Sequence, residues 1–279
     1  MRTYLECIPC FLKQALFAAR AATNDEKKIK EVLDRVGLLF PEIPLTSPPP
    51  ETASLVYPIV REITGVLDPY KGMKEKNIRE ALKVYSSMKA LVEAADDPLQ
   101  MAVKISIAGN SIDFGANPGF DFEAEIKEAI EKDFSLTHFE AFKRRLDKAR
   151  NILFLGDNAG ETVFDRILIE TMRKPVTYVV REKPIINDAT LEDAINSGLN
   201  EVAEVIPSGC DAPGTILSRC SKNVLQAFRN SDLIISKGQG NFEGLSEEKG
   251  PIFFLLMVKC PVIARHTGLK EGELVLMQA

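Results

Sequence analysis

Three polar stretches of the sequence carry side chains suited to metal and phosphate chemistry. Residues 156–161 read GDNAGE, residues 181–188 read REKPIIND, and residues 237–243 read KGQGNFE. Each stretch follows a short apolar run that is typical of a buried strand. Together they hold carboxylates, side-chain amides, a lysine and several glycines, which is more polar function than turning a chain requires. The pattern therefore predicts a site to which all three turns contribute.

Asp157, Asn158 and Asp188 offer oxygen ligands. Such ligands suit a hard divalent cation such as Mg²⁺ or Mn²⁺, which commonly keeps some waters and shares a phosphate oxygen. A structural alternative exists for each position. Asp157 and Asn158 are also typical of a turn that caps the next helix, and Asp188 precedes a capping box formed by Thr190 and Asp193. The coincidence of three polar turns favours the metal site.

Lys237 can hold a phosphoryl group as a point charge. Gly238 and Gly240, which follow it, permit the backbone to turn its N–H groups toward the same anion. A metal acting as Lewis acid and a lysine acting as electrostatic clamp would together form a phosphoryl-transfer site. The alternative is that Lys237 and Gly238 form only a solvated turn.

The second half of the chain alternates predicted strands with helical segments. We predict strands at 151–155, 176–180, 202–206 and 233–236, and with weaker signals at 252–258, 262–264 and 273–277. This alternation indicates right-handed crossovers and a mainly parallel sheet. The polar turns then share the carboxyl edge of the strands, where ligands bind in open α/β sheets.

The first half of the chain, residues 1–149, predicts helices throughout. A proline-rich connector at 40–50 interrupts them, and residues 109–119, which read GNSIDFGANPG, predict a structured loop. We therefore expect an α/β protein with two domains. An all-helical domain covers 1–149, with the loop 109–119 contributing to a pocket, and an α/β catalytic domain covers 150–279.

Composition narrows the class of protein. The chain has 279 residues, 45% of them hydrophobic, with 40 acidic and 35 basic side chains. A chain of this size can bury a substantial hydrophobic core, and its mildly acidic net charge argues against a general nucleic-acid surface. The longest apolar run, at 251–258, ends at Lys259 and is far shorter than the roughly 20 residues of a membrane helix. No secretory signal is recognisable, so we expect a cytoplasmic protein that binds neither nucleic acid nor membrane.

The five cysteines do not resemble a disulfide framework and fit reduced thiols. Cys7 and Cys10 form a Cys-x-x-Cys motif that could bind a metal, act as a redox pair, or supply buried structural thiols. The remaining three show no pairing pattern: Cys210, Cys220 and Cys260. The two histidines of the chain lie outside the three polar stretches, so a mechanism that requires a histidine base is disfavoured.

The segments GDNAGE, VREKPIINDAT and SKGQGNFE, with the amino-terminal ECIPC and the intervening GNSIDFG, resemble the damage-control phosphatases, formerly the domain-of-unknown-function 89 family. The resemblance spans nearly the whole chain, and the Cys-x-x-Cys start is similar to the short archaeal and bacterial branch. It implies a helical domain joined to a Rossmann-like, three-layer α/β/α domain. The implied activity is that of a metal-dependent phosphatase acting on small phosphorylated metabolites.

The resemblance also implies roles for single residues. The implied metal ligands are Asp157, Asn158 and Asp188, and the implied phosphate ligand is Lys237. Asn110 and Asp113 would line the pocket from the helical side, with Glu161 and Arg181 as further pocket residues. Asp157, Asp188 and Lys237 would carry the catalysis. The attacking group is either a metal-activated water or the Asp157 carboxylate.

Our leading hypothesis is a phosphomonoester hydrolase that uses Mg, Mn, Co or Ni and acts on sugar phosphates, nucleotides or phosphopantetheine-like compounds. The first alternative is an S-adenosylmethionine-dependent carboxyl methyltransferase, an activity also attributed to part of this family. The glycine-dense G-x-G cofactor turn usual in such enzymes is absent from the sequence. The second alternative is a non-catalytic metabolite-binding module that senses redox state through Cys7 and Cys10. Oligomeric state is left open.

Overall fold

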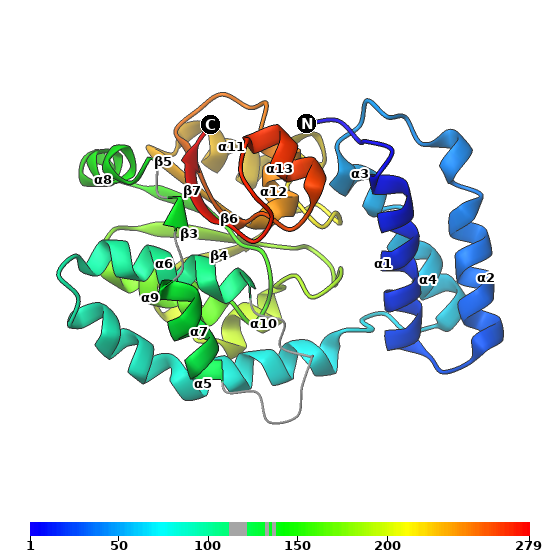
Figure 1. Ribbon diagram of the computed structural model, residues 1–279, viewed down its shortest axis with the longest axis horizontal. Coiled ribbons are helices and arrows are strands. Elements are labelled where there is room, and N and C mark those ends of the chain that lie inside the picture. Colours follow the sequence, from blue (N-terminus) through cyan, green and yellow to red (C-terminus); the bar gives the residue numbers. More distant parts are fainter. Residues whose placement is uncertain (112–121, 132–133, 136–137) are drawn as a thin grey trace.

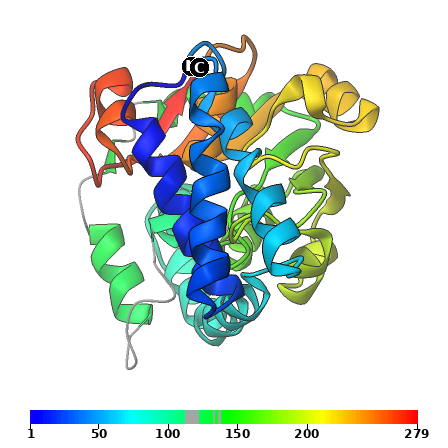
Figure 2. The ribbon, with the colours of Figure 1, turned by 90° about the vertical axis from the view of Figure 1, so that its right-hand side faces the viewer.

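The structure, a computed structural model, describes residues 1–111, 122–131, 134–135 and 138–279. Four amino-terminal helices form a bundle at one end of the molecule, and the other end is a sheet with helices on both faces (Figure 1). Seen from the bundle end, α1–α4 stand in front of the carboxyl edge of the sheet (Figure 2). The bundle therefore faces the edge at which the polar turns are expected.

The bundle consists of α1 (Cys7–Ala22), α2 (Glu26–Gly37), α3 (Pro49–Ala53) and α4 (Val56–Thr64). The Asp25 side chain accepts a hydrogen bond from the Lys27 N–H and caps α2, as its position in the sequence suggests. Gly65, with a φ of 75°, ends α4 in the left-handed conformation that glycine adopts without strain. The apolar faces of these helices bury one another in a hydrophobic cluster of their own.

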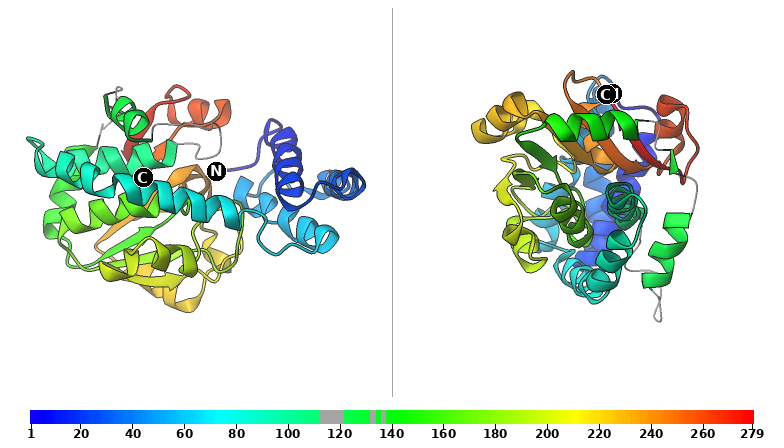
Figure 3. Two further views of the ribbon diagram at one scale, coloured as in Figure 1. Left: turned by 90° about the horizontal axis from the view of Figure 1, so that it is seen from below. Right: turned by 90° about the vertical axis from the view of Figure 1, so that its left-hand side faces the viewer.

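Four further helices precede the main part of the sheet: α5 (Lys71–Glu93), α6 (Pro98–Ser111), α7 (Phe122–Glu131) and α8 (Phe139–Lys148). Viewed from below, the long helix α5 runs across the sheet-containing part of the molecule (Figure 3). It packs with α6 and α9 (Thr162–Met172) over one face of the sheet. Across the described residues, no helix combines the length and the hydropathy that crossing a membrane requires.

The sheet has seven strands in the order β1-β7-β6-β5-β2-β3-β4. They are β1 (Phe134–Ser135), β2 (Ile152–Leu155), β3 (Val176–Val180), β4 (Glu204–Pro207), β5 (Leu233–Lys237), β6 (Ile252–Met257) and β7 (Leu274–Gln278). Every pair is parallel except β6 with β7. From β2 the chain moves outward to β4 and then returns to β5 on the other side of β2. The strand order reverses between β2 and β5, and such a switch point opens a ligand crevice.

Alternate residues of the strands enter different cores. In β2, Ile152 and Phe154 belong to the cluster beneath α5–α9 and α10 (Leu191–Asn196), whereas Leu153 and Leu155 face the opposite cluster. The second cluster is covered by α11 (Lys222–Asn230), α12 (Gly238–Leu245) and α13 (Pro261–Thr267). Because both faces are covered, the strands are apolar on both sides. The predicted fold class, a three-layer α/β/α arrangement preceded by helices, is confirmed.

Two strand predictions differ from the structure. Residues 262–264 lie in helix α13 and not in a strand, because Pro261 at its first turn and Gly268 just after its end delimit a short helix. The predicted strand 202–206 begins two residues later, as β4, because a 3₁₀ turn at Leu199–Glu201 precedes it. A buried apolar triplet alone does not distinguish a strand from a helix.

The hydrophobic cores are divided at a different place from the predicted domain boundary after residue 149. Helices α5–α8 precede that residue, yet their apolar faces share one cluster with the sheet, while α1–α4 have a separate cluster. One residue of the loop after β3, Ile185, joins the cluster of the bundle. The packing unit around the sheet therefore begins near residue 71, and the bundle docks onto a loop of the sheet edge.

Candidate metal and phosphate site

The turns after β2 and β3 are held together by their backbones. The N–H of Ala189 donates to the carbonyl of Asp157 over 2.8 Å, and Asn158 and Asp188 form an antiparallel bridge. The two turns thus behave as a miniature ladder at the carboxyl edge of the sheet. This pairing brings Asp188 next to Asp157 and Asn158, although Asp188 follows Asn158 by 30 residues in the sequence.

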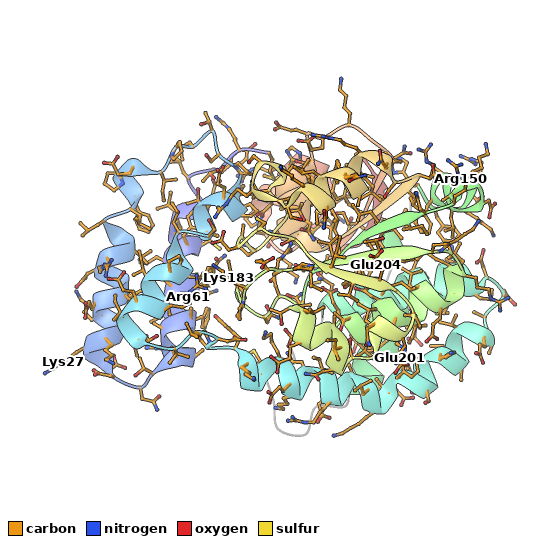
Figure 4. The ribbon with its side chains drawn as sticks, turned by 180° about the vertical axis from the view of Figure 1, so that it is seen from behind. Lys27, Arg61, Arg150, Lys183, Glu201 and Glu204 are labelled. Carbon is orange, nitrogen blue, oxygen red and sulfur yellow. The ribbon has the colours of Figure 1, made fainter. Side chains whose placement is uncertain are left out.

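A cavity of about 410 Å³ lies between this edge and the helical bundle. Asp157, Asn158 and Asp188 form one wall, together with Gln239 and Gly240 from the start of α12. The opposite wall comes from the bundle, chiefly Cys7, Cys10, Phe11, Pro49 and Pro50. Arg61 of α4 donates to the carbonyl of Pro184 over 3.2 Å beside the cavity, where the bundle meets the loop that carries Lys183 (Figure 4). The volume suits a small metabolite.

Arg181 lies behind the carboxylates and is almost completely buried. Its Nε donates to Asp188 Oδ2 over 2.6 Å, and its Nη2 lies 3.9 Å from Asp157 Oδ1. Burial raises the pKa of Asp188 to about 7 against the opposing charge of Arg181. Burial alone would lower the pKa of Arg181, but Asp188 and Asp157 outweigh it and raise that pKa. Arg181 therefore stays charged and orients the two carboxylates.

Asn110, at the end of α6, reaches Asp157 and a third carboxylate, that of Glu161, from the helical side. Its Nδ2 donates to Asp157 Oδ2 and to Glu161 Oε1, each over 2.8 Å. Its Oδ1 is buried and has no hydrogen-bond partner among the described residues. A buried carbonyl oxygen without a donor is costly unless something binds it. This unpaired oxygen beside Asp157 is suited to a cation or to a donor group of a ligand.

Lys237, the last residue of β5, is fully buried. Its Nζ lies 3.0 Å from Glu161 Oε2, and it also forms an ion pair with Asp165. Burial alone would lower the pKa of Lys237, but Asp165 and Glu161 raise it; burial raises the pKa of Glu161 to about 7 against the charge of Lys237. Lys237 thus does not line the cavity. In this geometry it neutralises carboxylates that lie directly beneath Asn110.

Glycine is required at positions 238 and 240 because other parts of the chain lie too close to leave room for a side chain. Gly238 has a φ of 77°, and a Cβ there would overlap the carboxylate of Asp157. A Cβ on Gly240 would overlap the carbonyl of Pro213. Because α12 begins at Gly238, the first N–H groups of that helix have no partner within the helix and lie at the cavity wall. A helix start of this kind can bind a phosphate.

The donor set fits a hard divalent cation. It comprises two carboxylates, Asp157 and Asp188, and the amide of Asn158, with the unpaired Oδ1 of Asn110 close by. Among the residues that the structure describes, no three His, Cys, Asp or Glu side chains are arranged to hold a metal. The predicted set contains only two such side chains, Asp157 and Asp188, because its third donor is the amide of Asn158. The chemistry of the set is that of Mg²⁺ or Mn²⁺ and not of a thiolate or imidazole site.

The structure separates the predicted site residues into two groups. Those that line the cavity are Asp157, Asn158, Asp188 and Gly240. Those that lie behind the wall and contact it are Asn110, Glu161, Arg181, Lys237 and Gly238. The predicted loop 109–119 is wrong at its start, because residues 109–111 lie in helix α6; the rest of it, with Asp113, lies outside the described residues. Their roles in catalysis and binding stay predictions.

Three residues of the site have no role in the sequence prediction. Asp165 pairs with Lys237, and Asn241 donates from Nδ2 to the carbonyls of Gly156, over 2.9 Å, and Lys237, over 2.7 Å. Glu243 lines the cavity. The available signal for Asp165 was an acidic residue among the apolar residues Val163, Phe164, Ile167 and Leu168 of the predicted helix. Asn241 and Glu243 lie within KGQGNFE, where their polarity was visible but their direction was not.

The cavity also collects three thiols, those of Cys7, Cys10 and Cys260. The other two cysteines meet as well: Cys210 is buried in a small cluster against which Cys220 packs. All five are free. The expectation of reduced thiols is compatible with this state, and the proximity of Cys210 and Cys220 is a feature that the sequence did not indicate.

A Rossmann-like sheet whose switch point carries an acidic turn, closed by a helical bundle, defines a class of small-metabolite-binding α/β proteins. Residues 3–275 match the family model described as the damage-control phosphatase ARMT1-like domain. The chain belongs to this family. The predicted resemblance is thereby confirmed.

Relatives of known sequence and structure agree with this assignment. A damage-control phosphatase of Pyrococcus horikoshii is 35% identical over 286 residues, which cover 100% of this chain and 98% of the relative. One from Archaeoglobus fulgidus is 33% identical over 279 residues, 96% of either chain. The crystal structure of a protein of the domain-of-unknown-function 89 family from Pyrococcus horikoshii superposes with a TM-score of 0.92 at 34% identity. It covers 100% of this chain and 99% of that one.

Proposed function

We propose that this protein is a divalent-metal-dependent phosphatase that hydrolyses phosphomonoesters of small metabolites, in keeping with the names of its relatives. The observation that carries the proposal is the convergence of Asp157, Asn158 and Asp188 on one wall of a cavity. A damage-control role, in which surplus or damaged sugar phosphates, nucleotides or phosphopantetheine-like compounds are removed, is part of the same proposal.

The residues divide the work as follows. Asp157, Asn158 and Asp188 hold the cation, which when bound supplies Lewis-acid activation and balances phosphate charge. The N–H groups at the start of α12 bind phosphate oxygens, and Gly238 and Gly240 allow the close approach. Arg181 keeps the two carboxylates oriented from behind. Helix α1 and the chain before α4 cover the cavity and exclude water from the phosphoryl group.

The proposal is tested by phosphate release from a panel of sugar phosphates, nucleotides and phosphopantetheine-like esters with Mg²⁺, Mn²⁺, Co²⁺ or Ni²⁺. We expect Asp157→Asn and Asp188→Asn to lower kcat/KM by roughly 10³-fold, because positioning and electrostatic stabilisation dominate phosphoryl transfer. Calorimetric titration with Mn²⁺ should show weakened metal binding in the same variants.

Asp34→Asn is the matched control, since it removes a carboxylate from an exposed ion pair with Lys30 on α2. It should leave both readouts unchanged. Phosphate release that survives in Asp157→Asn and Asp188→Asn would overturn the assignment of the site. Binding of S-adenosylmethionine without metal, together with no phosphate release from any ester, would favour the methyltransferase alternative.

A further inference from the structure

The charged side chains that line the cavity are mostly acidic. Among the described residues they are Glu6, Asp157, Asp188 and Glu243, against the single basic residue Lys259. Arg181 and Lys237 are buried behind the wall and already paired with carboxylates. A cation and one phosphate can balance each other here, but little positive charge remains for a second anion.

Glu243 is the acidic residue of this set that lies on α12 and is not among the predicted metal ligands. Gln239, one turn earlier, donates from Nε2 to Glu243 Oε1 over 2.9 Å. Gln239 Oε1 in turn accepts from the backbone N–H of Lys259 over 3.0 Å. Glu243 Oε2 accepts no hydrogen bond from any described residue. One oxygen of the carboxyl group is thus fixed, and the other is available to a ligand in the cavity.

Glu243 is half-buried at the cavity surface, and burial raises the pKa of its carboxyl group to about 7. Glu6 lines the same cavity but is more exposed and forms an ion pair. Its carboxylate forms an ion pair with Arg265 of α13 at 2.5 Å, and both side chains are about half exposed. An exposed, paired carboxylate interacts weakly with a ligand. The two residues therefore form a natural pair for comparison.

We propose that Glu243 is a specificity-determining residue that binds the non-phosphate body of the substrate and selects bodies with hydroxyl or ammonium donors over bodies with a second anion. The inference rests on the proposed phosphatase function and names the substrate class of the same cavity. A carboxyl oxygen accepts a hydrogen bond from a hydroxyl group and attracts an ammonium group. A second carboxylate or phosphate would lie against the acidic lining of this cavity, and this juxtaposition of like charges disfavours binding.

Three phosphate esters with six-carbon bodies test this inference: glucosamine 6-phosphate, glucose 6-phosphate and 6-phosphogluconate. All three carry the phosphate on carbon 6. The first two are sugar rings with an ammonium or a hydroxyl group on carbon 2, and the third is an open chain with a carboxylate at carbon 1. The comparison between variants cancels the difference between ring and open chain. Dissociation constants are measured by calorimetry with Ca²⁺ present, and kcat/KM by phosphate release with Mg²⁺. The wild type should prefer the ammonium ester to the carboxylate ester. Glu243→Gln should reduce that ratio about tenfold, and Glu6→Gln should change it less than twofold.

An unchanged ratio in Glu243→Gln, in binding and in turnover, would overturn the inference even if every ester is hydrolysed. An equal reduction in Glu6→Gln would also overturn it, since general acidity of the cavity would then explain the selection. A tenfold reduction seen in binding, with no turnover of any ester, would support Glu243 as the selecting residue while refuting the phosphatase proposal. Lys259→Gln gives a second check: Lys259 is the only basic lining residue in the part of the chain that the structure describes, and its removal should weaken binding of the carboxylate ester further.

Discussion

The two walls of the cavity differ in kind. The sheet wall is a dense network of buried charges, in which Arg181, Lys237 and Asn110 hold the carboxylates of two turns. The bundle wall presents thiols, prolines and the ring of Phe11. The first wall is held by backbone pairing and ion pairs, whereas the second consists of helices with their own hydrophobic core that dock onto a loop. Chemistry that needs fixed charges therefore belongs to the sheet wall, and shaping of the cavity belongs to the bundle.

The largest effect is expected when a buried charge beneath the sheet wall is removed, which tests whether buried ion pairs stabilise this wall. Asp165→Ala leaves Lys237 paired with Glu161 alone and leaves the hydroxyls of Ser106 and Tyr178 without their acceptor. We expect the free energy of unfolding to fall by about 3–5 kcal/mol, because the variant breaks a buried ion pair and leaves two buried hydroxyl groups without an acceptor. Urea unfolding followed by circular dichroism measures the change.

Lys30→Ala provides the control, because it breaks an exposed ion pair with Asp34 in the bundle. Its effect should stay below about 0.5 kcal/mol. If the loss of stability in Asp165→Ala is as small as that in the control, the buried ion pairs do not stabilise the sheet wall more than an exposed ion pair stabilises the bundle.

A smaller effect on stability, with a specific effect on chemistry, is expected from Gly238→Ala. The added methyl group would overlap the Asp157 carboxylate, and the φ of 77° disfavours any side chain. We expect a loss of about 1–2 kcal/mol in stability. Displacement of Asp157 should lower kcat/KM roughly 100-fold.

Gly268→Ala separates the two causes, since it shares a positive φ of 74° but has open space around its Cβ position. It should show a similar loss of stability without the loss of activity. Equal losses of activity in the two variants would show that backbone strain, and not contact with Asp157, explains the result.

The sequence predicted the sheet wall better than the bundle wall for a physical reason. Turns after parallel strands must share one edge, so Asp157, Asn158 and Asp188 could be grouped from strand order alone. The direction of a side chain depends on packing that no local pattern encodes. Lys237 was expected to face phosphate, yet its ammonium group lies against Glu161 and Asp165, because burial at the end of β5 makes paired carboxylates its best partners.

The sequence did not predict that the bundle forms a wall of the cavity, because the helical periodicity of residues 1–64 does not indicate which edge of the sheet these helices cover. Cys7 and Cys10 were identified as a motif, but their position in the cavity depends on docking of α1 against α13 and the loop after β3. Helix boundaries followed from local signals such as Asp25 and Gly65. Non-local docking followed from none of them.

The smallest effect is expected at the thiols of the bundle wall. Burial raises the pKa of Cys7 to about 11 and also raises the pKa of Cys10, so both side chains stay protonated near neutral pH. Since the thiolate reacts and the thiol does not, alkylation of Cys7 by iodoacetamide should be slow at pH 7.5. Its rate should rise roughly tenfold per pH unit until the pH approaches 11. Cys10→Ser should change KM less than about twofold.

Mass spectrometry of the peptide that contains both cysteines measures the rate, with N-acetylcysteine in the same solution as the reference thiol. Alkylation of Cys7 as fast as that of the reference at pH 7.5 would mean that its thiol is activated. The bundle wall would then take part in chemistry, and the contrast between a reactive sheet wall and a shaping bundle wall would fail. Slow alkylation with a normal KM in Cys10→Ser would instead confine the chemistry to the carboxylates of the sheet edge.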